Sequence, residues 1–299
     1  MPASNHSFVL PTSDPGVNIV GRRRGAGPAL LLLHGNPLTQ KSWDRIAPLL
    51  AQHFTVVTTD LRGYGDSGKP EGLADHSNYS FRRMAQDQVE VMQQLGFERF
   101  AVAGHDRGAR TAFRMAMDHP DKVRRVAFLD ILPTYCVFQN IQAQMAMDLY
   151  HWWFMAQPKG FPETLLRGNE EFYIRNKLMK QGPGKGGFTE DEILEYIRVC
   201  TPENIHSVCE DYRAAASIDL PMDTADLKAG RKLQPEALVL WGAKSHTSHH
   251  HDPRIEWPKY CERIVRMAEL PCGHYPTEQA PQETYQELHA FFSAADRKI

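Results

Sequence analysis

The sequence predicts an α/β fold built around a mostly parallel sheet, and three observations indicate it. Short apolar runs alternate along the chain with segments whose apolar residues recur at helical spacing. The runs are apolar without interruption, which is typical of strands that helices cover on both faces. The length of 299 residues suffices for one large domain or for a core with an inserted subdomain.

Six strands can be placed from the apolar runs, and we expect them to belong to an eight-stranded sheet. The strands are expected at 29–35, 54–60, 99–106, 123–132, 237–243 and 264–270. Helices are expected at 39–52, near 80–95, from Arg107 onward and over 280–296. The segments PTSDPG and PEGLADHSN have the composition of loops.

The alternation stops between about Pro133 and Leu233, where the sequence becomes helical and aromatic. Segments such as DLYHWWFMAQP and DEILEYIRVC show helical patterns, and the glycine-rich stretch QGPGKGG at 181–187 interrupts them. We interpret this third of the chain as a helical cap inserted into the sheet domain. The predicted division is a core of residues 1–133 and 234–299 and a cap of residues 134–233.

Composition argues against several classes of partner. The 34 Lys and Arg residues nearly balance the 36 Asp and Glu residues, and both signs are scattered, so we expect a small-molecule partner rather than nucleic acid or a membrane. The chain shows no signal-peptide pattern and no CxxC pair, which predicts a cytoplasmic protein. A homodimer is only the general expectation for soluble enzymes. The five cysteines are Cys136, Cys200, Cys209, Cys261 and Cys272.

The stretch VAGHDRGAR at 102–110 carries the first functional signal, because it follows an apolar run and begins a predicted helix. Gly104 and Gly108 flank Asp106 in the G-x-Nuc-x-G pattern with which α/β-hydrolases present a nucleophile on a tight strand-to-helix turn. Such a turn leaves no room for larger side chains at the flanking positions. For this motif alone, a simple N-cap aspartate remains an equal alternative.

An aspartate in place of serine predicts a particular reaction. A carboxylate that displaces a leaving group from a saturated carbon forms an ester on the enzyme, and water can open that ester at its carbonyl. Attack by serine would instead leave an ether, which water does not readily open. Asp106 therefore predicts alkyl transfer followed by hydrolysis.

Two further motifs accompany the turn in the order that α/β-hydrolases use. HGNP at 34–37 ends the first strong strand, so the backbone N–H groups of Asn36 and Arg107 are the expected oxyanion-hole donors. GHY at 273–275 follows the last strand and makes His274 the expected base that activates water.

The base needs a carboxylate that orients it. The usual position, after the run ALVLWGA, reads KSHTSHHHD and offers no acid before Asp252. Asp130 ends an apolar strand, where an unpartnered charge would be costly, so we favour Asp130 and keep Asp252 as the weaker alternative. The histidine run His246–His251 matches no standard ligand spacing, so we expect a solvated loop and no metal.

Arg107 and Arg110 lie three residues apart at the start of the predicted helix and hence on one face. The helix dipole disfavours cations at this end, so two of them indicate a nearby anion. Asp106 can supply the negative charge for one arginine, and the carboxylate of a short acidic substrate can supply it for the other. The alternative is that one or both pair with acidic residues of neighbouring loops.

These motifs together resemble the haloacetate dehalogenases, which include the fluoroacetate dehalogenases. The resemblance extends over roughly residues 17 to 297 and includes both core and cap. It implies an α/β-hydrolase fold, Asp106 as nucleophile, Asp130 as acid, His274 as base, and Arg107 and Arg110 as ligands of the substrate carboxylate. The motifs are HGNP, DLRGYGDSGKP, AGHDRGAR, LDILPTY, YHWWF, CEDYRA and CGHYP.

The resemblance also implies a halide pocket formed by His151, Trp152 and Tyr212 of the cap. Each presents an N–H or O–H donor from an apolar frame, which suits a departing halide, although YHWWF also reads as ordinary buried packing. Asn36 departs from the family, whose members commonly carry an aromatic residue within HGxP. The side chain of Asn36 would make that wall of the site smaller and more polar.

The sequence therefore predicts hydrolytic dehalogenation of a short 2-haloacid to glycolate and halide, without a cofactor. An epoxide hydrolase with the same Asp nucleophile is the alternative, but an epoxide has no anion for the two arginines. A binding protein that retains the fold without turnover is a third reading, which the complete set of Asp, Asp and His disfavours.

Overall fold

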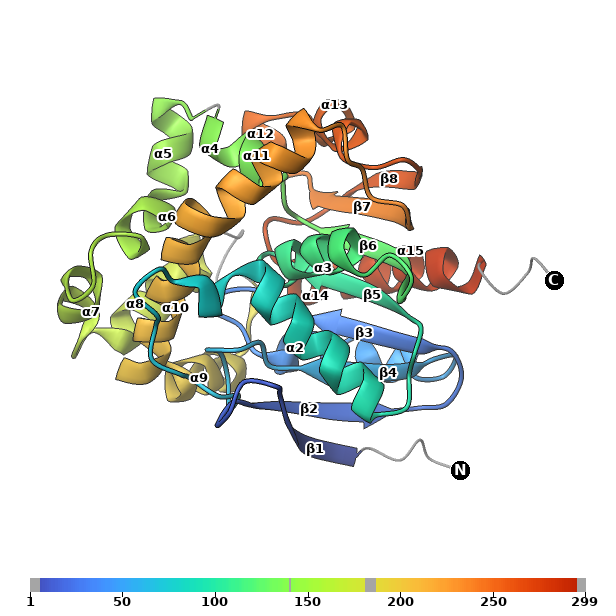
Figure 1. The fold of residues 1–299 in the computed structure, drawn as a ribbon, viewed down its shortest axis with the longest axis horizontal. Coiled ribbons are helices and arrows are strands. Elements are labelled where there is room, and N and C mark those ends of the chain that lie inside the picture. Colours follow the sequence, from blue (N-terminus) through green and yellow to red (C-terminus); the bar gives the residue numbers. More distant parts are fainter. Residues whose placement is uncertain (1–5, 140, 181–186, 295–299) are drawn as a thin grey trace.

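The computed structural model describes residues 6–139, 141–180 and 187–294, and it shows one twisted eight-stranded sheet with helices on both faces (Figure 1). The strand order is β1-β2-β4-β3-β5-β6-β7-β8. Strands β3 to β8 are parallel to one another, and β2 is antiparallel to both of its neighbours, β1 and β4. The predicted mostly parallel sheet is confirmed. Most of the glycine-rich stretch at 181–187 lies outside the described residues.

The strands that were placed from the sequence are all present, with shifts of a few residues at their ends. The strand predicted at 123–132 ends earlier, at Leu129, because Asp130 has a positive φ of 51° and leaves the extended conformation. The bounds are β1 His6–Pro11, β2 Asn18–Arg24, β3 Ala29–Leu33, β4 Thr55–Thr59, β5 Phe100–His105, β6 Val123–Leu129, β7 Glu236–Gly242 and β8 Ile264–Leu270.

Alternate residues of the central strands point into two separate apolar cores, as the period of a strand requires. Leu31 and Leu33 of β3 pack in the core that α2 (Phe81–Gln94) and α3 (Arg107–Asp118) cover. Leu30 and Leu32 pack in the other core, under α1 (Ala47–Leu50) and α15 (Pro281–Ser293). The sheet is thus buried on both faces, which explains its uninterrupted apolar runs.

The single helix predicted over 39–52 is wrong. The structure has a short 3₁₀ helix, η1 (Gln40–Trp43), and then the one-turn helix α1. Pro48 lies in the first turn of α1, where its missing N–H is tolerated, but it could not continue a helix from the preceding segment.

Between β6 and β7 the described elements are helices, and they gather at one end of the sheet (Figure 1). Cap side chains such as Trp152 and Tyr212 belong to the same apolar core as α2 and α3. Among the described residues, every helix is too short or too polar to cross a bilayer. The bounds are α4 Thr134–Gln139, α5 Ala143–Asp148, α6 Tyr150–Met155, α7 Phe161–Leu166, α8 Glu170–Lys180, α9 Glu190–Val199, α10 Pro202–Ala214, the π-helical η4 Ala215–Asp219 and α11 Leu220–Lys228.

Four short helices surround the site or the ends of the outer strands. They are η2 Ser77–Tyr79, α12 His246–His250, α13 Pro253–Glu256 and α14 Pro276–Gln279, and the 3₁₀ turn η5 Trp257–Lys259 follows α13.

Candidate active site

Asp106 lies in a tight turn between β5 and α3, with φ 48° and ψ −117°. The two flanking glycines are required by close packing. A Cβ on Gly104 would lie 2.4 Å from the carbonyl oxygen of Gly108, and a Cβ on Gly108 would lie 2.4 Å from that of His34. Since these neighbours are backbone atoms, a side chain at either position would disrupt the turn.

The carboxylate of Asp106 faces away from the helix that follows it. The side chain makes no capping hydrogen bond with α3, and instead its Oδ1 accepts the backbone N–H of Asn36 at 2.8 Å. Gly35 permits this approach, because a Cβ there would lie 2.5 Å from the Cβ of Asp106. The N-cap alternative therefore does not describe Asp106, and one of the two predicted oxyanion-hole donors contacts its carboxylate.

Asp130 and His274 form a buried hydrogen bond, with 2.6 Å between Oδ2 of Asp130 and Nδ1 of His274. The backbone N–H of Gly242 donates to Asp130 Oδ1 at 2.9 Å, and the hydroxyl of Ser245 donates to Oδ2 at 2.5 Å. Burial would raise the pKa of Asp130, but the hydrogen bond and positive charge of His274 hold it below its ordinary value. Asp130 is thus placed as an ionised partner of His274.

The weaker candidate, Asp252, has a different role. Its side chain accepts the backbone N–H of Arg254 at 2.9 Å and caps α13. Ser245, which the sequence did not single out, supplies a donor to Asp130 from the segment where a second acid was expected.

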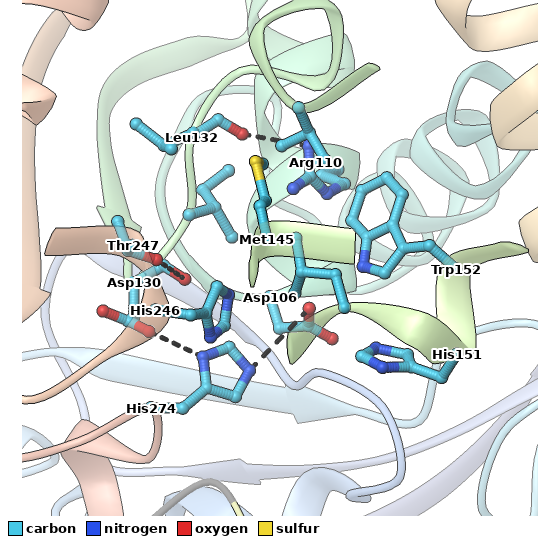
Figure 2. Close-up of a pocket in the computed structure, with 13 residues that line it drawn as sticks. Asp106, Arg110, Asp130, Leu132, Met145, His151, Trp152, His246, Thr247 and His274 are labelled. Atoms are coloured by element: carbon cyan, nitrogen blue, oxygen red, sulfur yellow. Dashed lines mark hydrogen bonds and ion pairs between the residues drawn. The ribbon is translucent and has the colours of Figure 1, made fainter. Parts of the chain in front are cut away.

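His274 lies between the two carboxylates, and Figure 2 shows its ring reaching toward both. Its Nε2 is 3.9 Å from Oδ2 of Asp106, farther than a hydrogen bond. His105 lies 2.7 Å through its Nε2 from the backbone carbonyl of His274, so that nitrogen carries the proton. Burial, followed by the charge of His274, lowers the pKa of His105 to about 4, which keeps its ring neutral.

The Asp106 carboxylate is ionised despite its burial. Burial alone would raise its pKa, but the charges of His274 and Arg107 and the N–H of Asn36 hold the pKa well below its ordinary value. An ionised carboxylate with one oxygen held by Asn36 leaves Oδ2 directed toward His274.

Arg107 contacts the acidic residue Asp211 through two of its three guanidinium nitrogens. Its guanidinium forms a fully buried ion pair with Asp211 of α10, in which Nε lies 2.8 Å from Oδ2 and Nη2 contacts Oδ1. The same guanidinium lies over the ring of Tyr212, 4.1 Å from its centroid. The alternative of an acidic protein partner is therefore correct for Arg107, although its Nη1 is buried without a hydrogen-bond partner among the described residues.

Arg110 differs, because no described carboxylate lies within ion-pair distance of it. Its Nη1 donates at 3.0 Å to the carbonyl of Leu132 and to the hydroxyl of Thr134, and the guanidinium lies over the Trp152 ring. Its Nε is buried and unpartnered within the described residues. Burial, followed by the charge of Arg107, lowers the pKa of Arg110 to about 10, so it is still a cation at neutral pH.

A small cavity of about 20 Å³ adjoins Asp106, Arg110 and His274 (Figure 2). This volume is little more than the ~10–15 Å³ that hold one water molecule, which favours a ligand of few atoms. Apolar side chains form the rest of one wall, and the sequence did not identify them. They are Ile131, Leu132, Val137, Met145 and Leu149.

Of the three predicted halide residues, His151 and Trp152 of α6 line this cavity. Tyr212 of α10 meets both rings edge-on, with 5.7 Å between centroids in each pair. Asn36 donates through Nδ2 to the hydroxyl oxygen of Tyr212 at 3.2 Å. Asn36, the polar residue that departs from the family pattern, is therefore hydrogen-bonded to Tyr212, a predicted halide donor.

Burial, reinforced by the charge of Lys177, lowers the pKa of His151 well below its ordinary value. His151 is then neutral near pH 7 and has one N–H to donate. Lys177 is itself buried on α8, and no motif in the sequence distinguished it.

The expectation of a wholly solvated histidine loop is wrong. His246–His250 form the short helix α12, and His246 lines the cavity with its ring 4.8 Å from that of His274. His250 pairs with Asp148 of α5 at 2.8 Å, whereas His249 is exposed. The packing of α12 against the site fixes these positions, and the spacing of the histidines alone did not reveal it.

Three potential metal ligands meet in the pocket, where atoms of Asp130, His246 and His274 lie within 4.8 Å of one another. Asp130 and His274 already use their facing atoms for a mutual hydrogen bond. A metal ion bound to all three would have to break this hydrogen bond.

Comparisons with known proteins agree with this architecture. A family model described as the alpha/beta hydrolase fold matches residues 28–183. The chain is 44% identical to a fluoroacetate dehalogenase from Burkholderia sp., over 91% of this chain and 89% of that protein. It is 31% identical to a soluble epoxide hydrolase from Corynebacterium sp., over 90% of this chain and 91% of that protein.

A solved structure from Nostoc sp. PCC 7120, provisionally described as an α/β hydrolase, superposes with a TM-score of 0.93 at 46% identity. The superposition covers 97% of this chain and 98% of that one. The similarity therefore includes the cap as well as the sheet.

The buried ion pair between Arg107 and Asp211 is expected to stabilise the folded protein. Replacing Asp211 by Asn leaves Arg107 as a buried cation without a countercharge, and we expect the free energy of unfolding to fall by about 3 kcal/mol or more. Urea denaturation measures the loss. The matched control is Asp66→Asn, which breaks an exposed pair with Arg198 and is expected to cost below about 1 kcal/mol. Equal, small losses in both variants would contradict the assigned role.

Proposed function

Because this chain belongs to the α/β-hydrolase family and is homologous to a fluoroacetate dehalogenase, we propose that it hydrolyses a short 2-haloacid such as fluoroacetate or chloroacetate. The products are glycolate and halide. The observation that carries the proposal is Arg110, a buried cation beside Asp106 with no acidic partner among the described residues. A substrate carboxylate supplies the missing negative charge.

The carboxylate is held by the two guanidinium nitrogens that lack partners, Nε of Arg110 and Nη1 of Arg107. Arg110 contributes its full charge, whereas most of the charge of Arg107 is balanced by Asp211. This arrangement brings the carbon next to the substrate carboxylate toward Asp106, which lines the same cavity as Arg110.

In the first step, Oδ2 of Asp106 attacks the carbon that bears the halogen. A carbon–oxygen bond forms as the carbon–halogen bond breaks, and the halide leaves with the bonding electrons. Oδ1, which accepts the N–H of Asn36, becomes the carbonyl oxygen of the resulting ester. The attacking oxygen is the one that faces His274 across 3.9 Å.

In the second step, a water molecule attacks the ester carbonyl while Nε2 of His274 takes its proton. Negative charge develops on Oδ1, where the N–H of Asn36 stabilises it together with the N–H of Arg107 at the first position of α3. Collapse of this intermediate expels the glycolate oxygen, which takes the proton from His274. The regenerated carboxyl group of Asp106 contains one oxygen from water and loses its proton to solvent. Asp130 stabilises the protonated His274 in between.

The departing halide is stabilised by N–H and O–H donors of His151, Trp152 and Tyr212. Asn36 donates to the oxygen of Tyr212, so the hydroxyl proton of Tyr212 remains available for the halide. The neutral state of His151 leaves it one N–H for the same purpose. All of these groups are protein side chains, and the scheme uses no cofactor.

Epoxide hydrolysis is the second candidate, since an epoxide hydrolase is among the relatives and shares the aspartate chemistry. The buried charge of Arg110 argues against it, because an epoxide ring presents no anion to that residue. The small cavity likewise favours a two-carbon acid over a substituted epoxide.

The decisive experiment is to incubate the purified protein with fluoroacetate and with chloroacetate and to measure free halide and glycolate. We expect both products in equal amounts from at least one acid. Formation of diol from a simple epoxide, with no halide released from either acid, would overturn the proposal in favour of the epoxide hydrolase.

Replacing His274 by Asn is expected to block the second step and preserve the first, because the base is lost and the nucleophile is not. The variant should release one halide per protein molecule and then stop. Intact-protein mass spectrometry should show the added carboxymethyl mass, located on Asp106 by peptide mapping. An unmodified variant after prolonged exposure to substrate would contradict the two-step scheme.

Replacing Arg110 by Leu removes the cation that the substrate carboxylate needs. A charge-assisted hydrogen bond contributes about 1.5–3 kcal/mol, so kcat/KM for haloacids should fall roughly 10- to 100-fold or more. The control is Arg82→Leu on α2, since Arg82 is exposed and pairs only with Asp118 at the surface. An Arg110→Leu variant with the same kcat/KM as the control would remove the clamp from the proposal.

A further inference from the structure

A second cluster of potential metal ligands lies outside the catalytic group. Atoms of Cys136, His251 and Glu256 lie within 4.8 Å of one another. Cys136 is on α4, at the start of the cap, whereas His251 follows α12 and Glu256 ends α13, in the core segment between β7 and β8. The cluster thus joins two parts of the chain that are more than a hundred residues apart in sequence.

The three donors are a thiol, an imidazole and a carboxylate, a mixture that suits Zn²⁺ better than the oxygen-preferring Mg²⁺ or Ca²⁺. Zinc binds sulfur, nitrogen and oxygen at about 2.0–2.3 Å, so neighbouring donors in a tetrahedral set are roughly 3.5 Å apart. Donors within 4.8 Å reach that spacing through side-chain movements on the order of 1 Å.

His251 provides an independent observation. Its Nε2 is buried and has no hydrogen-bond partner among the described residues. A buried polar atom without a partner costs free energy, and a bound cation would compensate that cost.

One neighbouring cation competes for the site. Nζ of Lys259 lies 2.8 Å from Oε2 of Glu256, but the side chain of Lys259 is 49% exposed. An exposed pair of this kind contributes little, and Lys259 can turn into solvent when the carboxylate binds a metal. Cys136, by contrast, is buried, so the thiolate would be protected from bulk water.

We propose that Cys136, His251 and Glu256 bind one Zn²⁺, with water as the fourth ligand, and so fasten the first cap helix to the core segment after β7. The thiol of Cys136 loses its proton to solvent when the ion binds. Val137, the next residue, lines the active-site cavity, and Thr134 of the same helix accepts a hydrogen bond from Arg110. The ion is structural, and it fixes one wall of the cavity without touching the reacting atoms.

Cobalt provides a direct test, because a thiolate bound to Co²⁺ gives a near-ultraviolet charge-transfer band that histidine and carboxylate do not give. The metal-free protein is titrated with Co²⁺ and then with Zn²⁺. We expect the band to appear with one equivalent of Co²⁺ and to disappear when Zn²⁺ replaces it. Absence of any band in the wild-type protein would overturn the proposal.

Variants identify the ligands. Cys136→Ser should abolish the band, and His251→Ala and Glu256→Gln should each weaken metal binding more than roughly tenfold. Two controls should retain the wild-type titration: His249→Ala, an exposed histidine of the same run, and Cys261→Ser, a buried cysteine elsewhere. A band that persists in Cys136→Ser, or that is lost in His246→Ala but kept in His251→Ala, would refute the assignment.

Thermal unfolding adds a readout that does not depend on activity. Stoichiometric Zn²⁺ should raise the Tm of the wild-type protein and of His249→Ala, and should leave the Tm of His251→Ala unchanged. If Cys136→Ser does not fold, the comparison of His251→Ala with His249→Ala still decides the question. An equal rise in Tm for both histidine variants would contradict a site at His251.

Discussion

The turn at Asp106 is the constraint on which the site depends. A positive φ at a residue other than glycine costs on the order of 1–3 kcal/mol, and the surrounding packing must compensate that cost. Gly104 and Gly108 permit the close backbone contacts of the turn, and Gly35 lets the HGNP loop reach the carboxylate. The turn also aims the carboxylate away from its own helix, so that it meets the N–H of Asn36 and faces the ring of His274.

The two buried arginines differ because only Arg107 has a direct carboxylate partner. Arg107 is paired with Asp211 and lies against the ring of Tyr212, so it connects α3 to α10. Arg110 has only neutral acceptors, the carbonyl of Leu132 and the hydroxyl of Thr134. The carboxylates of Asp106 and Asp223 act on this cation only from beyond ion-pair distance. A direct anionic partner would stabilise it further, which favours binding of an acidic ligand over a neutral one.

The sequence predicted those features that local pattern determines. Strands β3 to β8 follow from apolar runs, and Asp106, Asp130 and His274 follow from motifs at the ends of three of those strands. Strands β1 and β2 were not placed from the sequence, because they form the antiparallel end of the sheet and NIVGRRR is too polar to be recognised as a buried run.

Features that arise only from packing between distant segments could not be predicted. Asp211 is 104 residues from Arg107, and although it lies in the motif CEDYRA, the sequence does not identify it as the partner of Arg107. The contact of His246 with His274 depends on the short helix α12, whereas the histidine spacing suggested a solvated loop. The roles of the site residues in catalysis and the division into core and cap remain predictions.

The ion pair of Arg107 has a consequence for how this enzyme can change over evolutionary time. A helical segment between β6 and β7 that lacked an acid in place of Asp211 would leave Arg107, next to Asp106, as a buried cation without a countercharge. Successful chimaeras, natural or engineered, must therefore inherit the arginine and its aspartate together.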